Sequence, residues 1–198
     1  MPESGHFDKY DLQPMYKRIY EAYSKYNNNS YMWFEPGQFP DEVGISSYLN
    51  FVFDLGFSKP PGGEIGSKHH VLNDHSYCCQ ILGTCDKTGE PQPETAEMCK
   101  AWHEKRVGQR DLDAQALGIP LAISEFGACM DGDDCAREIT QLTDVCDEKL
   151  ASWAYWEFKT YKDLTTSAGD RSEGFYNKDG SLQVKKVKSL SRTYIQNA

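Results

Sequence analysis

Four short apolar or aromatic segments, separated by long connections, constrain the fold of this chain more than any other feature of its sequence. These segments are 31–34, 69–74, 120–124 and 152–157. Helical patterns are expected after Pro14, at 93–117, from 131–134 onward and at 184–194. Short buried strands that alternate with helices are typical of parallel βα units. The sequence therefore predicts an α/β fold with about four parallel strands.

Apolar spacing predicts which face of each helix is buried. The expected stripes are Met15, Ile19, Ala22 and Tyr26 in the first helix, Met98, Trp102 and Leu112 in the second, and Ile139, Leu142, Cys146 and Leu150 in the third. Gly118 is placed to end the second helix, because glycine adopts the left-handed conformation that a C-cap requires. Residues 37–67 contain several proline and glycine breakers and are predicted to form a long loop.

Length and charge narrow the classes of partner. A chain of 198 residues fits one domain and can bury about 70% of its unfolded surface without a disulfide scaffold. Its 21 Lys and Arg against 30 Asp and Glu give a net charge of −9 with no basic cluster, which argues against a nucleic acid or an anionic membrane surface as partner. No apolar stretch approaches the roughly 20 residues that span a bilayer. The first residues also lack the basic and apolar regions of a signal peptide.

The seven cysteines predict disulfides and no zinc site. They are Cys78, Cys79, Cys85, Cys99, Cys129, Cys135 and Cys146. Zinc sites favour pairs with two to four residues between the cysteines, and no such pair is present. Small loops closed at Cys129–Cys135, or among Cys79, Cys85 and Cys99, are expected, and an odd count leaves at least one thiol unpaired. Such a cysteine content is typical of secreted proteins, so the lack of a secretion signal suggests that an N-terminal segment is missing.

Polar residues follow each predicted strand. Glu35 follows the first strand, His75 and Tyr77 follow the second, Glu125 ends the third, and Trp156 lies at the end of the fourth. The carboxyl ends of parallel strands meet at one edge of a sheet, where α/β proteins build their sites. Any one of these residues alone would be an ordinary loop or capping group. Together they predict a functional site at that edge.

These motifs resemble glycoside hydrolase family 5 of the cellulase-like clan. Residues 123–127, Ile-Ser-Glu-Phe-Gly, are similar to the nucleophile strand of that family, in which an apolar strand ends in Glu followed by Phe-Gly. Residues 75–77, His-Ser-Tyr, are similar to its His-x-Tyr on the preceding strand, and 153–156, Trp-Ala-Tyr-Trp, to its last strand. Residues 31–36 and 73–78 narrow the resemblance to the endoglycoceramidase and glucosylceramidase-like branch. The resemblance extends from about Leu12 to Tyr194.

The resemblance implies a (β/α)₈ TIM barrel of which this chain is only a part. Residues 1–198 would be the C-terminal half of the catalytic domain, with strands five to eight, without the N-terminal half and without a following β-sandwich. The implied activity is hydrolysis of O-glycosyl bonds with retention, on glycosphingolipids in this branch, with no metal or organic cofactor. The full-length family member is expected to be secreted or lysosomal, although this chain has no signal peptide of its own.

The resemblance also implies roles for the site residues. Glu125 would be the nucleophile, and Tyr77 would hydrogen-bond its carboxylate and keep it ionised. His75 would contact the sugar or the acid, and Trp156 would stack on the sugar ring. Retaining glycosidases use two carboxyl groups, one as nucleophile and one as acid/base.

The acid/base is not expected among these residues. In the family it is the Glu of an Asn-Glu-Pro motif on the fourth strand, and no Asn-Glu-Pro occurs in this chain. Glu35 precedes a proline, but Phe34 comes before it and the strand count puts it on the fifth strand. Glu35 is therefore predicted to line the substrate pocket, and the acid/base to lie in the missing N-terminal half.

Several other functions are weighed against this one. A metal site at His69, His70 and His75 is disfavoured, because adjacent strand residues point to opposite faces. A thiol nucleophile, Cys78 or Cys79 beside His75, lacks an orienting residue, and the calcium-like run 131–134 lacks EF-hand spacing. A non-catalytic carbohydrate-binding or complementing half-barrel stays open. Its partners would be a glycan or glycolipid, and another half-barrel or a second copy of the chain.

Overall fold

The core of the computed structural model is a four-stranded parallel sheet. The structure describes residues 5–37, 42–43, 51–52, 55–86, 89–127, 129–159 and 173–192. The strands of the sheet are β1 (Met32–Phe34), β4 (His70–Ser76), β5 (Leu121–Phe126) and β6 (Ser152–Trp153), in that spatial order. Each neighbouring pair is parallel. The predicted α/β class with four parallel strands is therefore confirmed.

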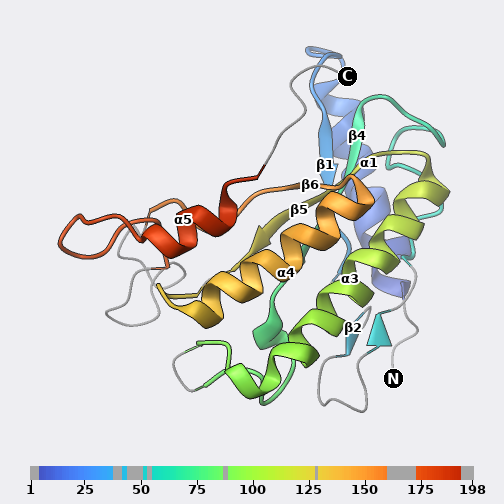
Figure 1. Ribbon diagram of the computed structural model, residues 1–198. Coiled ribbons are helices and arrows are strands. Elements are labelled where there is room, and N and C mark those ends of the chain that lie inside the picture. Colours follow the sequence, from blue (N-terminus) through green and yellow to red (C-terminus); the bar gives the residue numbers. More distant parts are fainter. Residues whose placement is uncertain are drawn as a thin grey trace.

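Helices cover one face of this sheet. The helices are α1 (Gln13–Tyr23), α3 (Ala96–Leu117), α4 (Asp133–Lys149) and α5 (Val184–Leu190), with a π-helical turn η1 (Asp8–Leu12) and the 3₁₀ turns η2 (Cys78–Gln80) and η3 (Pro93–Thr95). Helices α3 and α4 lie side by side over β4 and β5, and α5 packs against α4 (Figure 1). Helix α1 precedes β1 and lies at its side of the sheet (Figure 1). This one-sided covering leaves the other face of the sheet to the candidate site.

A short ladder interrupts the segment that was predicted to be a loop. Strands β2 (Glu42–Val43) and β3 (Phe51–Val52) pair antiparallel within residues 37–67. The prediction of a continuous loop was therefore wrong at these four positions. A two-residue strand is too short to show a period in the sequence.

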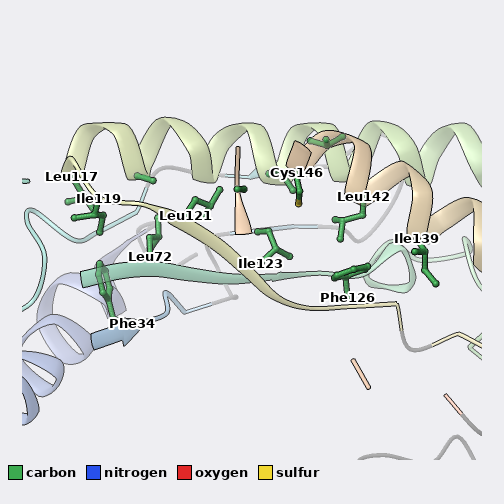
Figure 2. Packing of buried hydrophobic residues seen from close by; sticks show 14 of the residues in the cluster. Phe34, Leu72, Leu117, Ile119, Leu121, Ile123, Phe126, Ile139, Leu142 and Cys146 are labelled. Atoms are coloured by element: carbon green, nitrogen blue, oxygen red, sulfur yellow. The ribbon is translucent and has the colours of Figure 1, made fainter. Parts of the chain in front are cut away.

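The hydrophobic core fills the layer between the sheet and its helices. Phe34, Leu72 and Ile123 project from three neighbouring strands, and each is completely buried. They meet Leu142 and Cys146 of α4 in one continuous cluster (Figure 2). Complete burial of one such aliphatic or aromatic side chain stabilises the fold by roughly 1.5–3 kcal/mol. This layer fixes where the strand ends lie.

The predicted faces of α3 and α4 are partly right. Ile139, Leu142 and Cys146 are fully buried as expected, whereas Leu150 is 87% exposed because it caps the helix with a φ of 55°. In α3, Trp102 is buried, but Leu112 is 60% exposed. The buried face of α3 carries charged residues, so a search for apolar spacing misplaces it.

Helix α1 is rotated from its predicted orientation. Ile19 and Tyr26, two members of the expected stripe, are 48% and 92% exposed. Tyr16, Tyr20 and Tyr23 pack against the core in their place. Tyrosine can bury its ring while its hydroxyl finds a polar partner, so tyrosines compete with aliphatic residues for the buried face.

Gly118 ends α3 as predicted. Its φ is 66°, and its backbone N–H donates to the carbonyl of Gln115 at 3.1 Å. A Cβ at this position would lie 2.9 Å from the backbone nitrogen of Gly66. Glycine is thus required both by the left-handed conformation and by the close approach of the preceding loop.

Six of the seven cysteines form disulfides. The bonds are Cys78–Cys99, Cys79–Cys85 and Cys129–Cys135, and the buried Cys146 is free. The predicted Cys129–Cys135 loop and the odd thiol are confirmed. The prediction kept Cys79, Cys85 and Cys99 as one set, and the structure pairs Cys99 with Cys78.

Candidate functional site

The two faces of β4 have different roles. Leu72 packs in the core, and Asp74 and Ser76 contact α3, so these alternate residues point toward the helices. Asn73 and His75 therefore point to the opposite face, which is not covered by the helices that the structure describes. The candidate site lies on this second face, at the carboxyl end of the strand.

An irregularity in β5 turns Glu125 toward His75. Asp74 pairs with Ile123, but the next pair is His75 with Glu125, so Ser124 has no partner in the register. One extra residue shifts the alternation of a strand by one position. Ile123 and Phe126 consequently remain in the core, while Glu125 shares a face with His75. Without the extra residue, Glu125 would point toward the helices.

His75 lies between two carboxylates from different strands. Its Nε2 is 3.4 Å from Oε2 of Glu35, and its Nδ1 is 3.5 Å from Oε2 of Glu125. The three side chains are 16%, 29% and 30% exposed for His75, Glu35 and Glu125, respectively, so all three are accessible from one side. The structure brings together three of the predicted site residues that are separated by up to 90 positions in the sequence.

Tyr77 contacts the same carboxylate oxygen of Glu125. Its hydroxyl donates to Oε2 at 2.9 Å. Burial and the neighbouring charge of Glu125 raise the pKa of Tyr77 far above its ordinary value, so this hydroxyl stays a donor. Among the described residues, Oε1 of Glu125 has no hydrogen-bond partner, and it is the carboxylate oxygen left open to a ligand.

The surroundings of Glu35 favour its protonated form. Burial raises the pKa of Glu35 and the charge of Glu125 raises it further, while His75 and a hydrogen bond from Asn73 oppose the shift. Asn73 Nδ2 donates to Oε2 of Glu35 at 3.2 Å. The backbone N–H of Glu35 donates to the Tyr16 hydroxyl at 3.4 Å, which ties the end of β1 to α1.

Trp156 joins the same edge through backbone pairing. Its N–H donates to the carbonyl of Phe126 at 3.0 Å, and it forms a parallel bridge with Gly127. Trp156 therefore lies beside the end of β5, close in register to Glu125, and its side chain is half-buried. Gly127 has a φ of 96°, and a Cβ there would lie 2.0 Å from the ring of Tyr155, so no larger residue fits at this turn.

A buried ion cluster supports the site from the helix side. Asp74 is completely buried and lies 2.6 Å from Arg106 and 2.9 Å from Arg110, both on α3. Arg106 also donates from Nε to the carbonyl oxygen of His75 at 3.2 Å. Burial raises the pKa of Asp74, and the guanidinium of Arg110 opposes that shift. The cluster thus fixes the backbone on both sides of the peptide bond that joins Asp74 to His75.

Comparisons with known proteins identify relatives that resemble nearly the whole chain. No family model matches the chain. An endoglycoceramidase of Cyanea nozakii is 25% identical over 192 residues, which cover 97% of this chain and 32% of that protein. Endo-glycoceramidase II from Rhodococcus sp., in complex with a five-membered iminocyclitol, has a TM-score of 0.69 at 16% identity over 94% of this chain and 37% of its own. Its ganglioside GM3 complex has a TM-score of 0.62 at 18% identity.

Over nearly its whole length, this chain is similar to endoglycoceramidases. It spans about a third of the length of the relatives that it matches. Its four parallel strands correspond to about a third of a family 5 barrel chain. The resemblance stated from the sequence motifs is confirmed at this level.

The thiol alternative is contradicted in this endoglycoceramidase-like chain. Cys78 and Cys79, the two proposed nucleophiles, are both in disulfides, with Cys99 and Cys85. A sulfur in a disulfide has no thiolate to attack with. His75 faces two carboxylates instead of a cysteine.

The histidines outside the site have structural contacts. His70 is buried, with Nδ1 2.7 Å from the Ser67 hydroxyl and Nε2 2.9 Å from the Pro61 carbonyl. Within the described residues, no group of three or more His, Cys, Asp or Glu side chains is arranged to hold a metal ion. No helix among those residues is both long and apolar enough to span a membrane.

Sequence patterns alone missed a second, buried layer of polar residues behind Tyr77. Ser76, His103 and Glu138 are all nearly inaccessible to solvent, at 0%, 0% and 3% exposure. They contact one another and the turn that carries Tyr77. Their helical positions give the signal that could have found them: His103 recurs with Cys99, Trp102 and Val107 on one face of α3.

Proposed function

We propose that this chain belongs to a retaining glycoside hydrolase that cleaves the O-glycosyl bond of glycosphingolipids, with Glu125 as the nucleophile. The observation that carries the proposal is the convergence of Tyr77 and His75 on one oxygen of Glu125. Two contacts on Oε2 hold the carboxylate, and Oε1 stays open. A nucleophile requires both an ionised oxygen and an unobstructed approach.

The proposed first step forms a glycosyl–enzyme ester. Oε1 of Glu125 attacks the anomeric carbon, the bond from that carbon to the aglycone oxygen breaks, and the oxygen leaves with a proton from a general acid. Water then attacks the anomeric carbon and gives a proton to the same group, which now acts as a base, and the bond from that carbon to Oε1 breaks and restores the carboxylate. The hydroxyl of Tyr77 stabilises the ionised form of Glu125 before attack and after hydrolysis, because a donor lowers the free energy of the charged state.

Glu35 is proposed to bind substrate and not to act as the acid/base. The imidazole of His75 fills the space between Glu35 and Glu125, where the scissile bond would have to lie. Retaining glycosidases hold their two carboxyl groups about 5–5.5 Å apart with the sugar between them. We propose that the acid/base is supplied from outside these 198 residues, by an N-terminal half, and that the strands described here are the fifth to eighth of the barrel.

The proposed substrate class follows from the relatives. One similar solved protein is endo-glycoceramidase II from Rhodococcus sp., whose structures include a ganglioside GM3 complex. Trp156 is proposed to stack on a sugar ring, and His75 and Glu35 to hydrogen-bond its hydroxyl groups. Stacking on Trp suits a pyranose, whose axial hydrogens form an apolar face.

A fluorinated sugar tests the nucleophile in this chain by itself. In 2-deoxy-2-fluoro-β-glucosyl fluoride, the leaving fluoride takes the bonding electron pair and needs no general acid, while Oε1 of Glu125 bonds to the anomeric carbon. The fluorine at C2 slows hydrolysis of the product. Mass spectrometry of peptides should find the sugar on Glu125, and Glu125→Gln should remove the label. Labelling elsewhere would contradict the proposed nucleophile.

Natural leaving groups should behave differently. Glucosylceramide requires protonation of the departing oxygen, and loss of a general acid lowers the rate by about 10²–10⁴-fold. We expect the chain to cleave an activated dinitrophenyl glycoside far faster than glucosylceramide, with retention of the anomeric configuration. An inverted product would contradict the proposed mechanism.

A non-catalytic, complementing half-barrel is the second candidate. Trp33 on the edge strand β1 is 52% exposed, an unusual position for such a large ring. A sheet edge and face of this kind pair readily with further strands. Under this alternative, the chain would bind glycans without labelling at Glu125. Sedimentation would also show a mass above that of one chain, either for the chain alone or after an N-terminal half-barrel is added.

A further inference from the structure

The segment that carries Tyr77 is fastened on both sides by buried polar contacts. Ser76, directly before it, has its hydroxyl 2.8 Å from Nδ1 of His103 on α3. Cys78, directly after it, donates its backbone N–H to Oε1 of Glu138 on α4 at 3.1 Å. The residues on either side of Tyr77 are thus held by two different helices, α3 through His103 and α4 through Glu138.

The two contacts join behind the strand. Nε2 of His103 lies 3.6 Å from Oε1 of Glu138. A carboxylate accepts only, so the consistent arrangement has Nε2–H facing Glu138 and the Ser76 hydroxyl donating to Nδ1. The chain of polar groups from Ser76 through His103 and Glu138 to the backbone of Cys78 therefore has a hydrogen bond at each end and, in the middle, a polar contact of 3.6 Å that is longer than a hydrogen bond.

Burial of these polar groups lowers the stability of the fold, so we ask what they contribute in return. Glu138 is 3% exposed and His103 is fully buried. Burial of a carboxylate is destabilising even with one donor such as the Cys78 N–H, and an apolar pair of similar volume would serve packing alone equally well. The Cys78–Cys99 disulfide holds the same turn against α3, which leaves the polar groups to set its orientation.

We propose that Glu138 and His103 are positioning residues that clamp Ser76 and Cys78 and so aim the Tyr77 hydroxyl at Glu125. The inference rests on the proposed function of Glu125. The clamp acts only through Tyr77, because Glu138 and His103 lie on the helix side of the sheet and Glu125 on the opposite side. Its loss should impair attack by Glu125 without weakening sugar binding.

Nuclear magnetic resonance of the full chain tests the clamp without relying on activity. In protein labelled with ¹³Cζ-tyrosine, the Tyr77 signal is assigned by its loss in Tyr77→Phe. Glu138→Leu, which keeps the side-chain volume, should shift this signal in the folded protein. Glu138→Gln keeps an acceptor for Cys78 and should leave it near its wild-type position, and Glu148→Leu on the exposed side of α4 serves as the matched control.

The labelling reaction gives the functional readout. With 2-deoxy-2-fluoro-β-glucosyl fluoride, Glu138→Leu should lower the inactivation rate constant about 10-fold, as should Tyr77→Phe, because each loses a hydrogen bond to a charged group. The half-saturating concentration should stay unchanged. Glu138→Gln and Glu148→Leu should remain within about 2-fold of the wild type, on the same reasoning that no charged hydrogen bond of Tyr77 is lost.

The outcomes separate the two proposals. A wild-type chain that is never labelled at Glu125 would refute the proposed function, while the Tyr77 signal would still decide the clamp. An unmoved Tyr77 signal in folded Glu138→Leu would refute the clamp even if labelling occurs. If Glu138→Leu does not fold, Ser76→Ala removes one arm of the clamp with little loss of volume, and a Tyr77 signal unchanged in Ser76→Ala would overturn the inference.

Discussion

Residues of strand β4 contact ionisable side chains on both faces of the sheet, and these contacts differ in burial and in distance. On the site face, His75 and its two carboxylates are 16–30% exposed, at distances of 3.4 and 3.5 Å. On the helix face, Asp74 is fully buried and within 2.9 Å of two arginines. Loose, accessible contacts leave room for a ligand, whereas the tight, dry cluster holds the strand.

The two faces of β4 are therefore expected to have different roles, one in function and the other in stability. Water screens the charges on the site face, so each contact there contributes little to stability. In the buried cluster no water can replace a missing partner, so removal of one partner strongly lowers the free energy of unfolding. Function should therefore respond to changes on one face of β4 and stability to changes on the other.

The largest expected effect comes from breaking the buried cluster. Asp74→Ala leaves Arg106 and Arg110 buried without their shared carboxylate, and we expect a loss of about 3–5 kcal/mol in the free energy of unfolding. Glu125→Ala, on the other face, should cost less than about 1 kcal/mol. Urea titration followed by circular dichroism measures both.

A surface carboxylate on α3, the helix that carries Arg106 and Arg110, provides the control. Glu104 is 49% exposed and pairs with Lys100 at the surface, so Glu104→Ala should cost about 0.5 kcal/mol. Equal losses for Asp74→Ala and Glu125→Ala would show that the two faces do not differ in the way proposed.

The second largest effect concerns the disulfide on the helix side. Cys78–Cys99 closes 21 residues and Cys79–Cys85 closes 6. The chain-entropy model assigns about 3 kcal/mol to the first and about 2 kcal/mol to the second. Replacing each pair by alanine and comparing thermal or urea unfolding under the same buffer tests this order.

The contrast is expected to widen beyond the entropy difference. Cys78 and Cys99 are buried, so their replacement also leaves a cavity, while Cys79 is exposed. A larger loss for the Cys79–Cys85 pair would mean that the exposed turn, and not its attachment to α3, stabilises this end of β4.

Much of the site face was accessible from sequence, and most of the helix face was not. Glu35, His75 and Glu125 were predicted because each follows a recognisable apolar strand. Their convergence needs only the parallel order of the strands. The extra residue at Ser124, which turns Glu125 toward His75, could not be recognised in the apolar pattern.

The prediction of the buried helix faces failed for a physical reason. Arg106, Arg110 and Glu138 are buried with polar partners on other elements, and a linear pattern contains no information on such partners. Charged residues at helical spacing normally indicate a solvated face. Leu112 was therefore predicted to be buried, although it is exposed and the arginines take the inner side.

A smaller effect is expected when Trp156, the residue proposed to stack on the sugar, is truncated. Trp156→Ala should leave the free energy of unfolding almost unchanged, since Trp156 is half-buried at the sheet edge, but weaken sugar binding about 3–10-fold. Isothermal titration with a glycan measures the affinity. Trp102→Ala on α3 is the matched change, because that ring is 1% exposed and its loss should cost about 3–5 kcal/mol.

The two tryptophan variants should therefore show opposite patterns. Weaker folding but normal sugar affinity in Trp156→Ala would remove Trp156 from the proposed site and assign it to the core.

The smallest effect concerns the pH dependence of Glu35. Its pKa is raised by burial and by the charge of Glu125, with His75 opposing. A carboxyl group that binds its proton more tightly when folded destabilises the fold once it ionises. This cost is absent below the ordinary carboxyl pKa of about 4.3, grows as the pH rises through the raised pKa, and is complete above it.

Glu35→Gln should remove that cost, because glutamine resembles the protonated acid. We expect the variant to be more stable than the wild type at pH 7, by less than about 1 kcal/mol for a side chain with this exposure, and equal to it at pH 4. Urea unfolding at both values measures the difference, with Glu21→Gln on α1 as an exposed control. If Glu35→Gln is instead less stable at pH 7, the contact with His75 outweighs burial, and the site face of β4 contributes to folding as the helix face does.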